Sequence, residues 1–160
     1  MAEQGRTDEG IALIRAGLEH YVALGLRLNP GMYLSMLSEA QARAGQEEDA
    51  LATIEQAVAT VGEWQIDLFF VLLWRGELRL RQGDETKAAG DFQEAIAASR
   101  HMSAKTFELR ATTSLARLLM KQGKRNEART MLAEIYNWFT EGFDTARLKD
   151  AKALLDELNT

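Results

Sequence analysis

Four glycines recur at intervals of about 40 residues, and this period constrains the fold more than any other feature of the sequence. They are Gly5, Gly45, Gly83 and Gly123. Each opens the same pattern, in which a small residue follows five positions later and a large or medium apolar residue comes four positions after that. A fixed period of this length is typical of helical repeat arrays, in which each repeat packs against the next.

The small residues of this pattern suggest how the helices pack. They are Gly10, Ala50, Ala88 and Ala128. In a hairpin of two antiparallel helices, a small side chain at this position allows the helices to approach closely. We therefore predict that the methyl groups of the three alanines are buried between helices.

Apolar residues recur at helical spacing along nearly the whole chain, and no segment has the alternation of a strand. The predicted fold is all-α: an α-solenoid of about eight helices, stacked as antiparallel hairpins. The expected single domain, residues 1–160, divides into a first helix without a partner, three repeats and a capping helix. Their expected ranges are 8–26, 31–61, 64–100, 104–140 and 145–158. Since Gly5 is predicted to be the turn before the first helix, we expect a fragment of a longer protein.

Composition and motifs exclude several functions. The net charge is −5, which disfavours a nucleic-acid partner. The sequence contains no cysteine, and its first residues lack the apolar stretch of a signal peptide. Its apolar runs are much shorter than the about 20 residues that span a membrane. We expect a cytoplasmic protein without a membrane partner.

The sequence offers no candidate for catalysis, metal binding or cofactor binding. The two histidines, His20 and His101, are far apart and lack neighbouring ligands at metal-binding spacing. No Gly-x-Ser-x-Gly segment and no phosphate-binding Gly-Lys-Ser/Thr motif is present. We therefore expect no enzyme, no metal and no cofactor.

The segment from Gly83 to Ala95 resembles the tetratricopeptide repeat. It has the glycine turn, a small residue early in the second helix, an aromatic residue and another small residue. Gly76 supplies the small residue expected in the first helix, where the other repeats have Ser38 and Ala116. The repeats here are longer than the usual length of about 34 residues.

Longer stretches resemble one subgroup of these repeats, the C-terminal repeat region of bacterial adenylate-cyclase-like or predicted ATPase multidomain proteins. The stretches are residues 31–37, 75–78, 108–118 and 136–145. This resemblance implies a parent signalling protein with a cyclase-like or ATPase domain before the repeats. None of that catalytic machinery lies in this chain.

The tetratricopeptide resemblance also implies a binding groove, lined by the first helix of each repeat. The implied residues are Met32, Ser35, Glu39, Arg43, Phe70, Leu73, Trp74, Glu77, Arg81, Arg110, Thr113, Arg117 and Lys121. The groove would be acidic to apolar at one end and basic at the other, so an acidic part of a peptide would lie over Arg110, Arg117 and Lys121. The alternative is that these are solvated charges on helix faces. The Lys/Asn clamp of chaperone-binding relatives is not reproduced.

The segment 66–74 is apolar around the whole helix circumference. It is predicted either as a deeply buried core helix or as a helix that exposes Phe70, Leu73 and Trp74 as an adhesive surface. The expected function is a non-catalytic protein-protein interaction module that binds a partner protein or another domain of the parent chain. The alternative is a self-association module that forms a homodimer through helix 64–81 or through the unpaired first helix.

Overall fold

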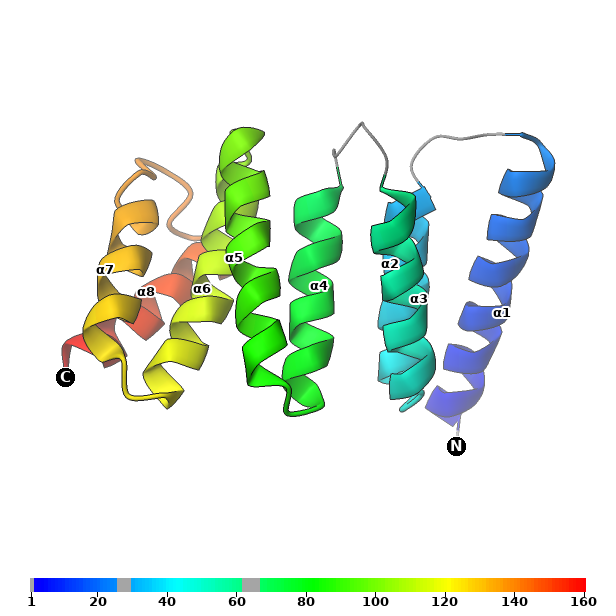
Figure 1. The fold of residues 1–160 in the computed structure, drawn as a ribbon, viewed down its shortest axis with the longest axis horizontal. Helices are drawn as coiled ribbons and strands as arrows, with labels where there is room; N and C mark the ends of the chain where they lie inside the picture. Colours follow the sequence, from blue (N-terminus) through cyan, green and yellow to red (C-terminus); the bar gives the residue numbers. More distant parts are fainter. Residues whose placement is uncertain (1, 26–29, 62–66) are drawn as a thin grey trace.

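The computed structural model describes residues 2–25, 30–61 and 67–160, with side chains for 8–25, 31–61 and 67–160. The described residues form eight helices and no strand (Figure 1). The helices are α1 (Ala2–Ala23), α2 (Pro30–Arg43), α3 (Glu47–Thr60), α4 (Leu68–Arg81), α5 (Glu85–His101), α6 (Lys105–Lys121), α7 (Arg125–Tyr136) and α8 (Ala146–Asn159). The helices are stacked side by side along the molecule, from α1 at one end to α7 and α8 at the other, which confirms the predicted α-solenoid.

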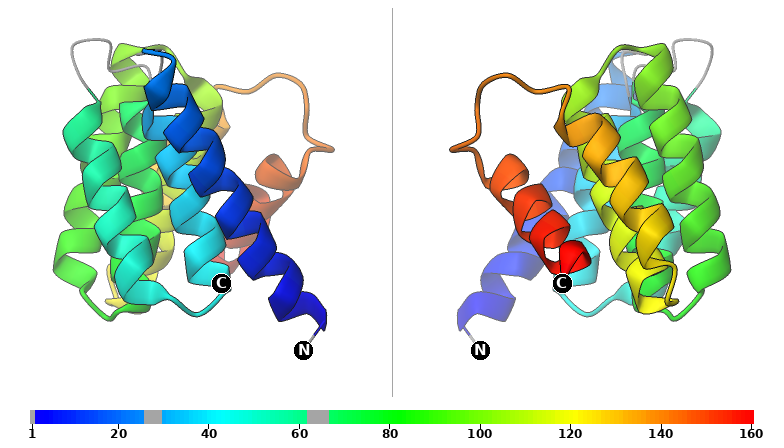
Figure 2. Two further views of the ribbon diagram at one scale, coloured as in Figure 1. Left: turned by 90° about the vertical axis from the view of Figure 1, so that its right-hand side faces the viewer. Right: turned by 90° about the vertical axis from the view of Figure 1, so that its left-hand side faces the viewer.

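The helices form two layers. Helices α2, α4, α6 and α8 contact one another in succession, whereas α3, α5 and α7 pack on these helices without contacting each other in the described part of the chain. Because the helices of the first group lie closer together, they form the inner layer of the curved stack, and α3, α5 and α7 form the outer layer. Helix α1 packs on α2 and is inclined to its neighbours (Figure 2).

Three of the four periodic glycines end inner helices as predicted. Gly45, Gly83 and Gly123 have φ values of +80°, +82° and +79°, in the left-handed region that glycine adopts without strain. At each turn the glycine N–H and the next N–H donate to carbonyls of the preceding helix. At Gly83, these bonds reach Leu80 and Arg79 at 3.1 and 2.9 Å.

The turn predicted at Gly5 is wrong. Gly5 lies inside α1, which begins at Ala2 and not at residue 8. A single glycine is tolerated inside a helix at a cost of about 1 kcal/mol, and no proline or turn signal interrupts this segment. The helix ends at Ala23, before the expected residue 26, because Gly25 adopts a φ of +67°.

The predicted small residues are buried between the helices. Ala50, Ala88 and Ala128 are all 0% exposed. Helices α4 and α5 approach closely at Gly76, where an added methyl group would lie 2.6 Å from Cε1 of Phe92. Helices can come this close only because glycine has no side chain.

Helix α4 is a core helix, as one of the two interpretations predicted. Its residues Val71 and Leu78 belong to a core formed with α2 and α3, while Leu72 and Leu73 belong to a larger core that extends to α8. Leu73 is only 1% exposed, so it is not part of an adhesive surface. The helix begins at Leu68; its expected start at Trp64 lies outside the described residues.

The chain leaves α7 at Tyr136, four residues before the expected end of the third repeat. Phe139 packs against the core, and the rings of Tyr136 and Phe143 lie 5.7 Å apart. These contacts favour a compact loop over a longer helix. The loop then leads to α8, whose residues Leu148, Ala151 and Leu154 are buried.

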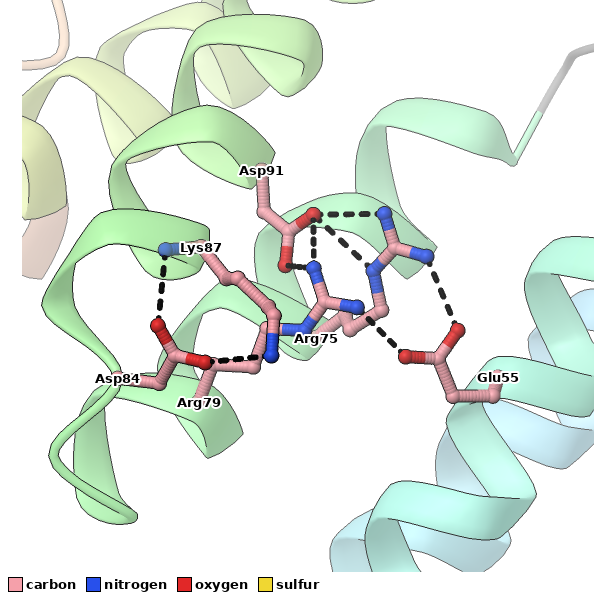
Figure 3. A network of polar contacts seen from close by, with 6 residues as sticks. All are labelled: Glu55, Arg75, Arg79, Asp84, Lys87 and Asp91. Atoms are coloured by element: carbon pink, nitrogen blue, oxygen red, sulfur yellow. Dashed lines mark hydrogen bonds and ion pairs between the residues drawn. The ribbon is translucent and has the colours of Figure 1, made fainter.

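A buried charge network joins three helices (Figure 3). Asp91 of α5, only 2% exposed, accepts bonds of 2.6–3.0 Å from Arg75 and Arg79 of α4. Both arginines also reach the half-exposed Glu55 of α3, at 3.1 and 2.6 Å. The network places two guanidinium groups between carboxylates of neighbouring hairpins and thereby fixes how those hairpins stack.

Candidate functional site

The inner layer carries a cavity of about 420 Å³ between α4, α6 and α8. It is lined by Glu77 of α4, by Leu109, Arg110, Thr113, Ser114 and Arg117 of α6, and by Ala146, Arg147 and Asp150 of α8. The α6 residues share one face of that helix because residues three and four positions apart lie above one another. On this face Arg110 is half-buried and Arg117 is exposed, whereas Ala111, Leu115 and Leu118 on other sides of the helix are buried in the core.

Most polar groups of the cavity already have partners. Ser114 Oγ donates to Glu77 Oε1 at 2.5 Å, and Thr113 Oγ1 donates to the Leu109 carbonyl at 2.7 Å. Arg117 forms an ion pair with Asp150. These bonds link α6 to α4 on one side and to α8 on the other.

Arg110 differs from the other charged residues of the cavity. Its side chain is half-buried and, among the described residues, forms neither a hydrogen bond nor an ion pair. Burial and the nearby charge of Arg147 lower the pKa of Arg110, against the opposing effect of Glu77 and Glu39. An anion that enters the cavity would stabilise the charged form of this guanidinium.

A second cavity of about 460 Å³ continues the first along α6 and the start of α8. The two share Leu109, Ala146 and Arg147. The remaining lining residues of the second cavity are Thr106, Phe139, Glu141, Gly142, Thr145 and Leu148. Together the two cavities form one groove between α6 and α8, which we call the α6/α8 groove.

Four of the predicted groove residues line this groove: Glu77, Arg110, Thr113 and Arg117. The remaining predicted residues lie elsewhere on the inner layer, namely Met32, Ser35, Glu39, Arg43, Phe70, Leu73, Trp74, Arg81 and Lys121.

Several of these other residues are engaged within the protein. Ser35 is 1% exposed and, like Leu73, cannot meet a partner. Glu39 pairs with Arg43 at 2.6 Å, and Lys121 pairs with Glu85 at 2.6 Å.

The aromatic residues of α4 are also held in place. Trp74 Nε1 donates to Ser38 Oγ at 3.2 Å, and the Arg81 guanidinium lies 5.7 Å from the Trp74 ring centroid. The Phe70 ring packs edge-on against Phe107 at 6.2 Å. Of the predicted set, Met32 is the large apolar side chain with the most exposure, at 40%.

Sequence reasoning missed the contribution of α8. Arg147 and Asp150 of α8, which are not among the predicted groove residues, line the α6/α8 groove. The direction in which the polar face of α8 points depends on the loop after α7, which the sequence pattern did not predict. The available signal was two opposite charges at helical spacing, Arg147 and Asp150, opposite the free face of α6.

Within the described residues, no group of three or more acidic, histidine or cysteine side chains is arranged to hold a metal ion. Among the same residues, no helix is both long and apolar enough to cross a membrane. The groove itself offers guanidinium groups, carboxylates and hydroxyls beside apolar side chains.

Solved structures with TPR-like repeats are similar to this chain. BtubC (BKLC) from P. vanneervenii matches with a TM-score of 0.79 and 19% identity over 95% of this chain and 65% of that one. TPR-like repeats of a Podosopora anserina protein described as a putative kinesin light chain match with a TM-score of 0.73 and 18% identity, over 98% of this chain and 79% of theirs. A second structure of these repeats, with one residue substituted, gives a TM-score of 0.75 at 18% identity, covering 98% of this chain and 78% of that one. No protein-family model and no curated protein sequence matches. The likeness shows a TPR-like fold.

Proposed function

We propose that this chain is a non-catalytic protein-protein interaction module that binds a partner polypeptide in the α6/α8 groove. The observation that carries the proposal is a continuous groove on the inner layer, in which the half-buried Arg110 has no anionic partner among the described residues. Binding grooves combine apolar area, which gives affinity, with a few oriented polar groups, which give specificity. The α6/α8 groove offers both.

The partner is either another protein or another domain of a longer parent chain. The sequence resemblance to adenylate-cyclase-like and predicted ATPase proteins supports a bacterial signalling parent, in which the repeats would connect a catalytic domain to its regulator. The absence of cysteine suits the reducing cytoplasm.

A second candidate function is self-association through α1. Leu13 and Val22 of α1 and Leu24 just after it are 68%, 70% and 74% exposed, the highest values among the large apolar side chains of the described residues. The burial of Leu73 leaves α4 a weaker candidate for the same role. Light scattering across a concentration series tests this function, because Leu13→Glu and Val22→Glu should dissociate a dimer formed through α1. A parent chain that stays monomeric at all concentrations would exclude self-association.

A pair of matched substitutions tests the proposed groove. Ala146 is exposed at the junction of the two cavities, so Ala146→Trp fills the α6/α8 groove without changing any charge. Ala97→Trp on the outer helix α5 is the control, since Ala97 is also exposed. Both variants should retain the helical circular dichroism and unfolding midpoint of the parent chain.

The immobilised parent and variants are then used to capture proteins from an extract of the source organism, with quantification by mass spectrometry. The proposal predicts at least one protein that the parent and Ala97→Trp retain and that Ala146→Trp loses. If every captured protein is retained equally by the two variants, the α6/α8 groove is not the binding surface.

A further inference from the structure

Two guanidinium groups converge on the α6/α8 groove from different helices. Arg110 comes from α6 and Arg147 from the first turn of α8, and both line the 420 Å³ cavity. The Arg147 guanidinium lies 5.8 Å from the centroid of the Phe107 ring, a contact that positions the side chain without neutralising its charge. The positive end of the α8 dipole lies beside it and adds to the same potential.

The acidic residues of the cavity compensate the charge of this pair only in part. Asp150 is engaged by Arg117, and Glu77 accepts the hydroxyl hydrogen of Ser114. In the described part of the chain, Arg110 and Arg147 form no ion pair with either carboxylate. The two like charges disfavour each other, and this repulsion contributes to the lowered pKa of Arg110. An entering anion would relieve it.

We propose that Arg110 and Arg147 form a subsite for one carboxylate, supplied by an aspartate or glutamate side chain of the bound partner. The subsite rests on the proposed function and gives it a chemical specificity. It makes α8 part of the binding surface as well as the end of the stack.

The composition of the cavity favours a carboxylate over a phosphate group. Glu77 lines the same cavity and, among the described residues, forms no ion pair, so an anion beside the arginines also experiences its negative charge. A phosphate group carries close to two negative charges at neutral pH and is repelled more strongly than a carboxylate, which carries one. Glu77 thus favours the ligand that carries the smaller negative charge.

Binding of a short peptide measures the subsite directly. The probe is tetraglutamate, acetylated and amidated so that only its side chains are charged, and tetraglutamine with the same ends is the neutral control. Chemical shifts of the arginine Nε–H groups in the ¹⁵N-labelled chain report which guanidinium is contacted. We expect tetraglutamate to shift the signals of Arg110 and Arg147 in a saturable manner and tetraglutamine to leave them unchanged.

Charge-matched variants separate a specific subsite from general attraction. Lys149 lies two residues beyond Arg147 on α8 and does not line the α6/α8 groove, so Lys149→Gln removes the same charge from the same helix. Arg110→Gln and Arg147→Gln should each weaken tetraglutamate binding about tenfold, as expected for loss of one charge-assisted hydrogen bond. Lys149→Gln should weaken it less than about twofold, as a screened surface charge does.

The subsite is refuted if Lys149→Gln weakens binding as much as Arg147→Gln, or if tetraglutamine shifts the same signals. Inorganic phosphate that binds these two arginines more tightly than tetraglutamate would overturn the assignment to a carboxylate. Failure of the subsite can be distinguished from failure of the proposed function. A partner that Ala146→Trp loses but Arg110→Gln and Arg147→Gln retain would leave the groove in place and remove only the carboxylate subsite.

Discussion

Two substitutions of glycine by alanine should change stability in opposite directions. Gly76 lies in α4 and Gly90 in α5, both inside helices. A methyl group on Gly76 would lie 2.6 and 2.8 Å from two carbons of the Phe92 ring and 3.2 Å from Asp91 Cβ, whereas one on Gly90 would have no heavy atom within 4 Å. The same chemical change therefore tests the close contact between α4 and α5 against open space.

The magnitudes follow from packing and helix propensity. Carbon atoms in contact normally lie about 3.5–4.0 Å apart, so the Gly76 methyl would overlap the ring by about 1 Å. Phe92 is 0% exposed and cannot move aside freely. Overpacking of this kind costs about 1–3 kcal/mol, while replacing a helical glycine by alanine contributes up to about 1 kcal/mol. Gly76→Ala should lower the unfolding free energy by about 1–2 kcal/mol, and Gly90→Ala should raise it by about 1 kcal/mol.

Equilibrium urea denaturation followed by circular dichroism measures both effects, with thermal unfolding as a second assay. In a chain of this size, 1 kcal/mol corresponds to a shift in Tm of about 2–4 °C. The m-values should match those of the parent, since a changed m-value would indicate loss of two-state behaviour. If both substitutions raise stability to the same extent, the close approach of α4 and α5 at Gly76 is refuted.

Three further substitutions probe the buried charges by the same denaturation assay. Asp91→Asn should destabilise the chain by about 3 kcal/mol because two arginines lose their buried counter-charge. Glu55→Gln, at the half-exposed edge of the network, should destabilise it by less than about 1 kcal/mol. Equal effects of the two substitutions would contradict a buried network. Glu108→Gln should destabilise the chain near pH 7. Burial raises the pKa of Glu108, but the bonds from Arg100 and Lys105 outweigh this and hold it below its ordinary value of 4.5. A lowered carboxyl pKa adds stability above pH 4.5 that is lost as the pH falls through the folded-state value. The difference between Glu108→Gln and the parent should therefore shrink with acidification, and a difference that is constant down to about pH 3, more than one unit below the ordinary value, would contradict the assignment.

The sequence pattern predicted the features that local rules determine. The left-handed turn at Gly83 and the buried methyl group of Ala88 follow from the repeated spacing, because each is a requirement of a single hairpin. The glycine pattern failed at Gly5, where the helix continues, since one glycine does not by itself end a helix. The turn that ends α1 is at Gly25.

The groove was predicted only in part, because its composition depends on how separate helices meet. The repeat register placed Arg110 and Arg117 on one face of α6, which the spacing of a helix determines. It did not predict that Asp150 would pair with Arg117 or that Arg147 would join Arg110. Those arrangements depend on the path of the loop after α7 and on the orientation of α8. The spacing of residues within single helices does not predict either of them.

The most direct test of the central claim is to map by crosslinking where a bound partner contacts the chain. A benzophenone side chain introduced at Arg117, on the inner face of α6, should form a photochemical crosslink to the captured partner. The same group introduced at Glu94, exposed on the outer helix α5, should not. Crosslinking from position 94 without crosslinking from position 117 would place the partner on the outer layer and contradict recognition through the α6/α8 groove.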